Sequence, residues 1–223
     1  MNTLAKVQAD FDRLALLSDD GWSHNSHYHP FLLKHVPQHI ETALEIGCGT
    51  GGFSRLLAQR ADHVLALDLS PQMIRIARER SADYPNIEYE RANAEVRELP
   101  ESAFDCIATI ATMHHLPLEA MLLKMKRALK PGGVLLVLDL YQVEQWGWQD
   151  VVRNAVAMPY SFWLKLFKTG RLRPPREVRE AWEEHGKIDH YLSPEQIRSA
   201  CAELPGAKIR FHLLWRYSII WKK

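Results

Sequence analysis

The segment from Ala43 to Ser54 restricts the fold of this chain more than any other. It begins as an apolar run, Ala-Leu-Glu-Ile, and then breaks into glycines at positions 47, 49, 51 and 52. A helical pattern follows, so we predict a buried strand, a tight turn and the first turn of a helix. Glycines permit positive φ and let a ligand lie against bare backbone. The free N–H groups of the helix start favour a polar or anionic group, which predicts a nucleotide-like ligand here.

Apolar segments of strand length recur after this turn, and polar residues follow their ends. Val64–Asp68 is a second predicted strand that ends in an acid, and Ser70 with Pro71 then begins a helix with proline in its first turn. The third, fourth and fifth predicted strands are Asn86–Glu90, Phe104–Ile110 and Val134–Leu140. Alternating strands and helices with right-handed crossovers predict a parallel sheet that is covered on both faces.

The glycines alone fit two cofactor patterns. Gly47, Gly49 and Gly52 satisfy the dinucleotide pattern G-x-G-x-x-G. The pattern E-x-G-x-G-x-G is satisfied by Glu45 and the glycines at 47, 49 and 51. Asp68 suits both cofactors, because an acid at the end of the second strand can bind both hydroxyls of a ribose. The segments that follow are therefore needed to choose between them.

In their order along residues 43–141, the strands, turns and helices resemble the class I S-adenosylmethionine (SAM)-dependent methyltransferases. The similarity is to the small soluble enzymes of the ubiquinone-biosynthesis type, and it includes the Leu-Lys-Pro-Gly-Gly of residues 129–133. The resemblance implies an α/β, Rossmann-like, doubly wound fold with a mostly parallel seven-stranded sheet. It also implies an antiparallel C-terminal hairpin, which we place at Lys208–Leu213 and Tyr217–Trp221.

Length and apolar content predict a single domain with additions. The 223 residues are 47% apolar, which is enough for one substantial core. Ser193 is predicted to cap a late helix, with Gln196 at its third position. The predicted parts of the single methyltransferase domain are an N-terminal helical segment or lid (1–40), the SAM-binding core (41–141), a helical insertion on the substrate side (142–192), and a closing helix and strands (193–223).

Carried over onto this chain, the resemblance implies a SAM site beyond the ends of the strands. The glycine turn would lie under the methionine part of SAM, Glu45 would hold the turn or meet the amino group, and Asp68 would bind the ribose. Asn93 stands where many members have Asp, so we expect weaker binding of adenine at that position. The residues implied to contact SAM are Tyr28, Glu45, Gly47, Cys48, Gly49, Gly51, Asp68, Leu69, Met73, Asn93, Ala94 and Ile110.

Methyl transfer depends on alignment more than on covalent help, because the SAM sulfonium is already a good leaving group. A general base is needed only for an acceptor that is protonated at working pH. The candidate bases are His29, in the histidine-rich stretch 24–29, and His114 and His115 after the fourth strand. The alternative for His115 is helix capping or packing. The histidines at 24, 27 and 29 could bind zinc, but no Cys or carboxylate pattern accompanies them, so we predict no metal.

Charge and hydropathy limit the partners. A net charge of +1 gives no global attraction to nucleic acid or to an anionic membrane. The longest apolar runs have the length of strands, so we predict no membrane span. Three scattered cysteines favour reduced thiols in a cytoplasmic protein. The sequence leaves the oligomeric state open.

We therefore expect a SAM-dependent enzyme that transfers a methyl group to O, N or S of a small-molecule acceptor by direct in-line displacement. One alternative is an RNA or protein methyltransferase that docks through basic residues of the insertion. Another is a SAM-binding regulatory protein without turnover. Nearby Glu177 and Glu180 dilute the basic charge, so a solvated helix face is the simpler interpretation. The basic residues in question are Lys165, Lys168, Arg171, Arg173, Arg176 and Arg179.

Overall fold

Seven strands form one mixed sheet in the computed structural model, which describes residues 3–17, 21–142, 147–170, 173–187 and 189–223. The strand order is β3-β2-β1-β4-β5-β7-β6. The first five strands are parallel, and β7 runs antiparallel to both of its neighbours. This confirms the predicted fold class, including the C-terminal hairpin. The strands are β1 (Ile40–Ile46), β2 (Ala61–Asp68), β3 (Ile87–Arg91), β4 (Phe104–Ile110), β5 (Leu129–Leu140), β6 (Lys208–His212) and β7 (Arg216–Lys222).

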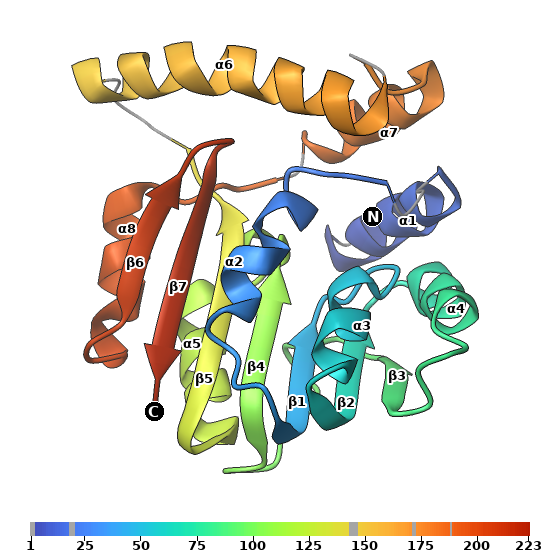
Figure 1. The fold of residues 1–223 in the computed structure, drawn as a ribbon, viewed down its shortest axis with the longest axis vertical. Coiled ribbons are helices and arrows are strands. Elements are labelled where there is room, and N and C mark those ends of the chain that lie inside the picture. Colours follow the sequence, from blue (N-terminus) through green and yellow to red (C-terminus); the bar gives the residue numbers. More distant parts are fainter. Residues whose placement is uncertain (1–2, 18–20, 143–146, 171–172, 188) are drawn as a thin grey trace.

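Helices cover both faces of the sheet and pack on it through two apolar clusters. The cluster that includes Leu32 and Phe53 joins α2 and α3 to one face, and the cluster that includes Met121 and Ile197 joins α5 and α8 to the other. Figure 1 shows α2 and α3 in front of the sheet and α5 behind it. The α-helices are α1 (Thr3–Leu17), α2 (His29–Leu33), α3 (Gly52–Ala58), α4 (Pro71–Arg80), α5 (Leu118–Ala128), α6 (Trp148–Thr169), α7 (Arg176–His185) and α8 (Pro194–Ala200); the 3-10 helices are η1 (Ser26–Tyr28), η2 (Met113–His115) and η3 (Cys201–Glu203).

Three helices lie beyond the carboxyl ends of the parallel strands. α1 packs against α4 and α7, and α6 extends across the whole edge (Figure 1). Three hydrogen bonds attach α6 to the body: His24 Nε2 to Ser161 Oγ at 2.9 Å, Trp215 Nε1 to Asn154 Oδ1 at 2.6 Å, and Arg153 Nη1 to the Tyr141 hydroxyl at 2.9 Å. In the described part of the chain, no helix is long and apolar enough to span a bilayer. Because α6 extends across this edge and is hydrogen-bonded to the body, the helices of residues 148–185 lie over the predicted site.

Helix starts follow the capping chemistry predicted from the sequence. Ser70 caps α4 by accepting a hydrogen bond from the backbone N–H of Met73 at 3.0 Å. Ser193 and Gln196 form a reciprocal capping box at α8. Each cap satisfies a backbone donor that the first helical turn leaves free. These caps fix where α4 and α8 begin relative to the sheet.

Candidate active site

The glycine turn after β1 is shaped by neighbours that leave no room for a side chain. Gly47 has φ +75°, and a Cβ there would lie 2.0 Å from Thr112 Oγ1. Gly51 has φ +80°, and its Cβ would lie 2.3 Å from the Tyr89 hydroxyl. Gly49 differs, because nothing lies within 4 Å of the place where its Cβ would be. The turn therefore packs tightly on the protein at two glycines and leaves open space at the third.

Asp68, at the end of β2, is fixed by backbone donors on both of its oxygens. Its Oδ2 accepts from Gly49 N at 2.8 Å, and its Oδ1 accepts from Ser70 N at 2.9 Å. Burial raises the pKa of Asp68 to about 6, although these N–H donors oppose the rise. Asp12 of α1 accepts from Ser70 Oγ at 2.5 Å, which brings the N-terminal helix beside this carboxylate. The arrangement ties the glycine turn, α4 and α1 together around one acid.

Glu45 is buried in the middle of the sheet and binds the start of α3. Its Oε2 accepts a hydrogen bond from Ser54 Oγ at 2.5 Å, and only 2% of the residue is exposed. Burial raises the pKa of Glu45 to about 8, which favours the neutral carboxyl group. In the structure, this residue holds the helix that follows the glycine turn.

Two residues that the resemblance places at the cofactor bury their side chains in the protein interior. Cys48 packs with Ile74 and Ala77 of α4, and burial raises the pKa of its thiol. Met73 packs with Leu14 of α1. Burial keeps Cys48 a neutral thiol, so it has none of the thiolate character of a nucleophile.

The remaining predicted cofactor residues line the same edge. Leu69 and Ile110 are half-buried at the ends of β2 and β4. Asn93 follows β3, where its Oδ1 accepts from Glu95 N at 3.0 Å. The carbonyl of Ala94 accepts from a lysine of α5 at 2.8 Å. The lysine contact holds the turn after β3 next to α5.

Tyr28 and His29 lie on the α3 side of the edge. The hydroxyl of the buried Tyr28 donates to the carbonyl of Leu213 at 2.5 Å. The His29 ring lies 5.0 Å from the ring of Phe53 at the start of α3, and burial lowers the pKa of His29 to about 4. Among the described residues, no ring contact or ion pair joins His29 to His114 or His115. The three candidate bases are thus split between two places.

His114 is held by an acid that sequence reasoning missed. Asp139, at the end of β5, is fully buried and accepts from His114 N at 2.8 Å, and its Oδ1 lies 2.7 Å from His114 Nδ1. Burial by itself would lower the pKa of His114, but the Asp139 carboxylate outweighs it and raises this pKa. The available signal was an acid that closes the apolar run Val-Leu-Leu-Val-Leu, as Asp68 closes β2.

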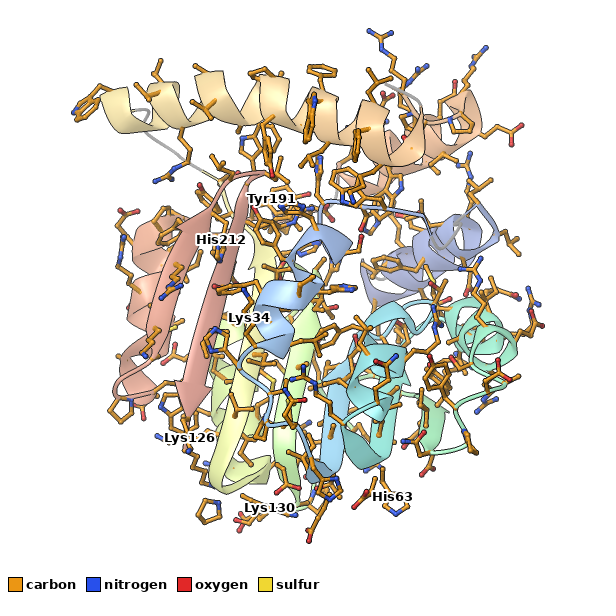
Figure 2. The ribbon with its side chains drawn as sticks, in the orientation of Figure 1. Lys34, His63, Lys126, Lys130, Tyr191 and His212 are labelled. Carbon is orange, nitrogen blue, oxygen red and sulfur yellow. The ribbon has the colours of Figure 1, made fainter. Side chains whose placement is uncertain are left out.

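A second carboxylate joins the histidines to the insertion. Asp189 Oδ1 lies 3.4 Å from His185 Nε2, 3.8 Å from His115 Nδ1 and 4.0 Å from His114 Nε2. Its Oδ2 accepts from the Tyr191 hydroxyl at 2.5 Å. Figure 2 shows Tyr191 at the end of the sheet beneath α6. The i, i+4 spacing of His185 and Asp189 was a signal in the sequence, but nothing there indicated that they meet His114.

Arg216, at the start of β7, is a buried cation that sequence reasoning also missed. It is 8% exposed; its Nε donates to Asn25 Oδ1 at 2.6 Å and its Nη1 to the Leu214 carbonyl at 2.9 Å. No ion pair joins it to a carboxylate within the described ranges. Its charge acts on the Tyr28 and His114 side chains, so it lies on the β4–β5 side of the edge. Burial lowers the pKa of Arg216 and the buried Asp139 carboxylate opposes this, so the cation has an anion nearby but no direct ion pair. A ligand anion in contact with the guanidinium would stabilise the buried charge further.

Comparisons with known proteins identify the family and the fold of this chain. A family model described as a methyltransferase domain matches residues 43–133, the span from the glycine turn to the Gly-Gly before the apolar part of β5. The chain belongs to the class I SAM-dependent methyltransferases, and the cofactor of this class is SAM. The family predicted from the strand and glycine pattern is therefore confirmed.

Individual relatives agree with this assignment. An uncharacterized methyltransferase of Mycobacterium tuberculosis is 29% identical over 209 residues, which are 92% of this chain and 98% of that protein. The malonyl-[acyl-carrier protein] O-methyltransferase of Serratia marcescens is 30% identical over 73% of this chain and 52% of its own length. The solved structure of phosphoethanolamine N-methyltransferase 1 of Haemonchus contortus, with phosphoethanolamine and S-adenosylhomocysteine, has a TM-score of 0.68 at 16% identity, covering 99% of this chain and 48% of that one. This last similarity shows the shared fold.

Proposed function

We propose that this enzyme transfers the methyl group of SAM to O, N or S of a small-molecule acceptor by direct in-line displacement. The observation that carries the proposal is the arrangement of one sheet edge. The glycine turn and Asp68 lie at the ends of β1 and β2, and a buried group of charged side chains lies at the ends of β4, β5 and β7. Ligands of open α/β sheets bind at the switch between β1 and β4, which separates these two groups.

We call the part of the edge at the ends of β1 and β2 the donor side, because it would hold the methyl donor SAM through the residues that the family resemblance implies. The part at β4, β5 and the start of β7 is the acceptor side. Asp68 would bind the ribose hydroxyls, and the open space at Gly49 would admit the methionine part against bare backbone. The N-terminal segment with Tyr28 would close over it. Bound SAM supplies an activated methyl group on sulfur. The chain then has to align the acceptor with that carbon and exclude water.

The acceptor side would favour a molecule with a carboxylate or phosphate group. Arg216 offers a buried guanidinium that forms no direct ion pair with a carboxylate of the described chain, although the Asp139 carboxylate acts on it from nearby. Its planar donors suit either anion. His114 and His115 would form the neighbouring wall and face the attacking atom. The Haemonchus contortus structure contains phosphoethanolamine, a small acceptor with a phosphate, which is consistent with this chemistry.

Docking of RNA through the insertion is less well supported. Arg176 pairs with Glu180 at 2.5 Å and Arg179 approaches Glu183 at 3.5 Å, so acids on the same helix face neutralise part of the basic charge. Arg171 lies outside the described residues. All three cysteines are buried and free, which agrees with the reducing environment of a cytoplasmic location.

The test combines cofactor binding with acceptor turnover. S-adenosylhomocysteine and SAM should raise the melting temperature, whereas NAD should not; at about 100 times Kd a ligand adds roughly 2.7 kcal/mol. Turnover should then be measured with amines, phenols and thiols that carry a carboxylate or phosphate, beside their neutral analogues. Arg216→Gln should raise KM for the anionic acceptor at least about tenfold and leave S-adenosylhomocysteine affinity unchanged. Arg210→Gln, at an exposed arginine of β6, is the matched control. Turnover with RNA or protein alone would overturn the proposal.

A further inference from the structure

Four side chains beside the proposed acceptor wall form a group with the chemistry of a metal site. His114, His115, His185 and Asp189 each offer one ligand atom, and these four atoms lie within 4.8 Å of one another. We propose that these residues bind a divalent transition-metal ion of the Zn²⁺ type. The sequence-based expectation of no metal rested on a different set of histidines, those at 24, 27 and 29. The inference goes beyond methyl transfer, and binding of the ion does not depend on the identity of the acceptor.

Three of the four residues carry buried polar atoms without a hydrogen-bond partner. His115 Nε2, His185 Nε2 and Asp189 Oδ1 are buried without a hydrogen-bond partner within the described structure. Their side chains are 9%, 2% and 5% exposed. Each such atom destabilises the fold when nothing satisfies it. Two of them, His185 Nε2 and Asp189 Oδ1, lie 3.4 Å apart, and His115 approaches the same oxygen with its Nδ1 at 3.8 Å. The unpartnered pair indicates a missing common partner, and imidazole and carboxylate lone pairs both suit a cation.

The distances fit an ion better than a network of hydrogen bonds. Asp189 Oδ1 faces nitrogens of His185, His115 and His114 at 3.4, 3.8 and 4.0 Å, and none of these approaches has hydrogen-bond geometry. Ligands that bind zinc tetrahedrally at about 2.0–2.2 Å stand roughly 3.3–3.6 Å apart. The three separations from Asp189 Oδ1 therefore exceed this range by at most a few tenths of an ångström. The other ligand atoms lie within 4.8 Å of one another, so the histidines would have to move closer together around a central ion.

Neighbouring acids orient the ligands in the manner of known metal centres. Asp139 Oδ1 lies 2.7 Å from His114 Nδ1, and Asp10 Oδ2 of α1 lies 3.5 Å from His185 Nδ1. The hydroxyl of Tyr191 holds the second oxygen of the ligand carboxylate at 2.5 Å. Metal-binding histidines commonly place their other ring nitrogen on a carboxylate in this way. The supporting groups are thus in position for three of the four ligands.

The types of the four ligands indicate which ion they would bind, and the elements that supply them indicate what the ion would do. Three imidazoles and one carboxylate favour zinc, cobalt or nickel over magnesium and calcium, which prefer oxygen. His114 and His115 come from η2 in the core, whereas His185 and Asp189 come from the end of α7 and the segment after it. Four protein ligands form a closed set of the structural kind. The ion would pin the insertion to the core and so complete the acceptor wall, a last step that rests on the proposed function.

Metal binding can be tested on the full chain after removal of ions with a chelator. Isothermal titration with ZnCl₂ should show one ion per chain for the wild type, and that ion should raise the melting temperature. Asp189→Asn and His185→Gln should each weaken zinc binding by at least about 100-fold, and Asp139→Asn by about 10–100-fold. His190→Gln, at an exposed neighbour of Asp189, should bind as the wild type does.

Two further measurements keep the proposal open to disproof. S-adenosylhomocysteine titrated into the same variants reports whether they fold and separates failure of the metal site from failure of the proposed function. If a variant does not fold, cobalt(II) added to the wild type should give the intense visible bands of a four-coordinate ion. Absence of zinc binding by the folded wild type, or equal affinity in Asp189→Asn and His190→Gln, would overturn the inference.

Discussion

The donor and acceptor sides of the sheet edge satisfy their polar atoms in opposite ways. On the donor side, Asp68 accepts hydrogen bonds from Gly49 N and Ser70 N at 2.8 and 2.9 Å, and all three residues belong to the single β1–α3–β2 unit and the turn after it. On the acceptor side, Asp189 meets histidines from distant segments at 3.4–4.0 Å, and its Oδ1 stays unpartnered. A continuous motif thus builds a complete donor side. Tertiary packing builds the acceptor side, where Asp139 and His114 satisfy each other while Asp189 Oδ1 has no hydrogen-bond partner among the described residues.

The largest expected effect tests how rigid the donor side is. Gly47→Ala should lower the unfolding free energy by roughly 2–5 kcal/mol, because it adds strain at φ +75° and a methyl group 2.0 Å from Thr112 Oγ1. Gly206→Ala is the matched control, since Gly206 has φ +80° but no neighbour within 4 Å of its Cβ position. It should show the strain alone, about 1 kcal/mol. Equal losses in urea unfolding would mean that the turn can relax away from Thr112.

The next effect concerns the neutral carboxyl group beneath the glycine turn. Glu45 has its pKa raised to about 8 by burial, against an ordinary value of 4.5. The folded protein then keeps a proton that the unfolded chain releases, so wild-type stability falls as pH rises from about 4.5 to about 8. Glu45→Gln should remove this dependence and gain roughly 2–3 kcal/mol relative to the wild type between pH 5 and pH 7. Parallel stability profiles for the two proteins would contradict a buried neutral Glu45.

A smaller effect separates cofactor binding from stability. Asp68→Asn should weaken S-adenosylhomocysteine binding by about 1–3 kcal/mol, the range for loss of a charged hydrogen-bond partner. Asp62→Asn, at an exposed acid of the same strand, should leave affinity unchanged. Isothermal titration of both variants gives the comparison. Unchanged affinity in a folded Asp68→Asn protein would remove the ribose role and leave Asp68 a purely structural acid.

The same contrast explains which parts of the fold could be predicted. Phe104–Ile110 matches β4 residue for residue, because an apolar strand between turn residues is a local signal. β5 was predicted to begin at Val134 but begins at Leu129, since Leu129 pairs with Phe104 and extends the strand through the Lys-Pro-Gly-Gly stretch. Local composition indicated a break there, and pairing with a neighbouring strand overrode it.

The residues of the candidate site likewise differ in whether local sequence could reveal them. Glu45 and Asp68 could be found because they close or interrupt apolar strands next to the glycines. His185, Asp189 and Arg216 could not, since their meaning comes from neighbours that only folding supplies; His185 meets Asp10 across 175 positions. No periodicity or spacing records such a contact. Sequence reasoning therefore found the glycine turn with its acids and, on the other side, only His114 and His115; it missed the residues from separate segments that surround these two histidines.

The smallest expected effect tests whether the insertion is itself a charged docking surface. Arg179 lies 3.5 Å from Glu183 one helical turn away, and both side chains are largely exposed. Such pairs contribute about 0.3–0.5 kcal/mol, so Arg179→Ala should change the unfolding free energy by less than about 0.5 kcal/mol and leave small-molecule turnover unchanged. Gel-shift titration with RNA at low and high salt supplies the sharper comparison. Tight binding that weakens in Arg179→Ala and with added salt would make the insertion an electrostatic contact surface and move the acceptor from small molecules to nucleic acid.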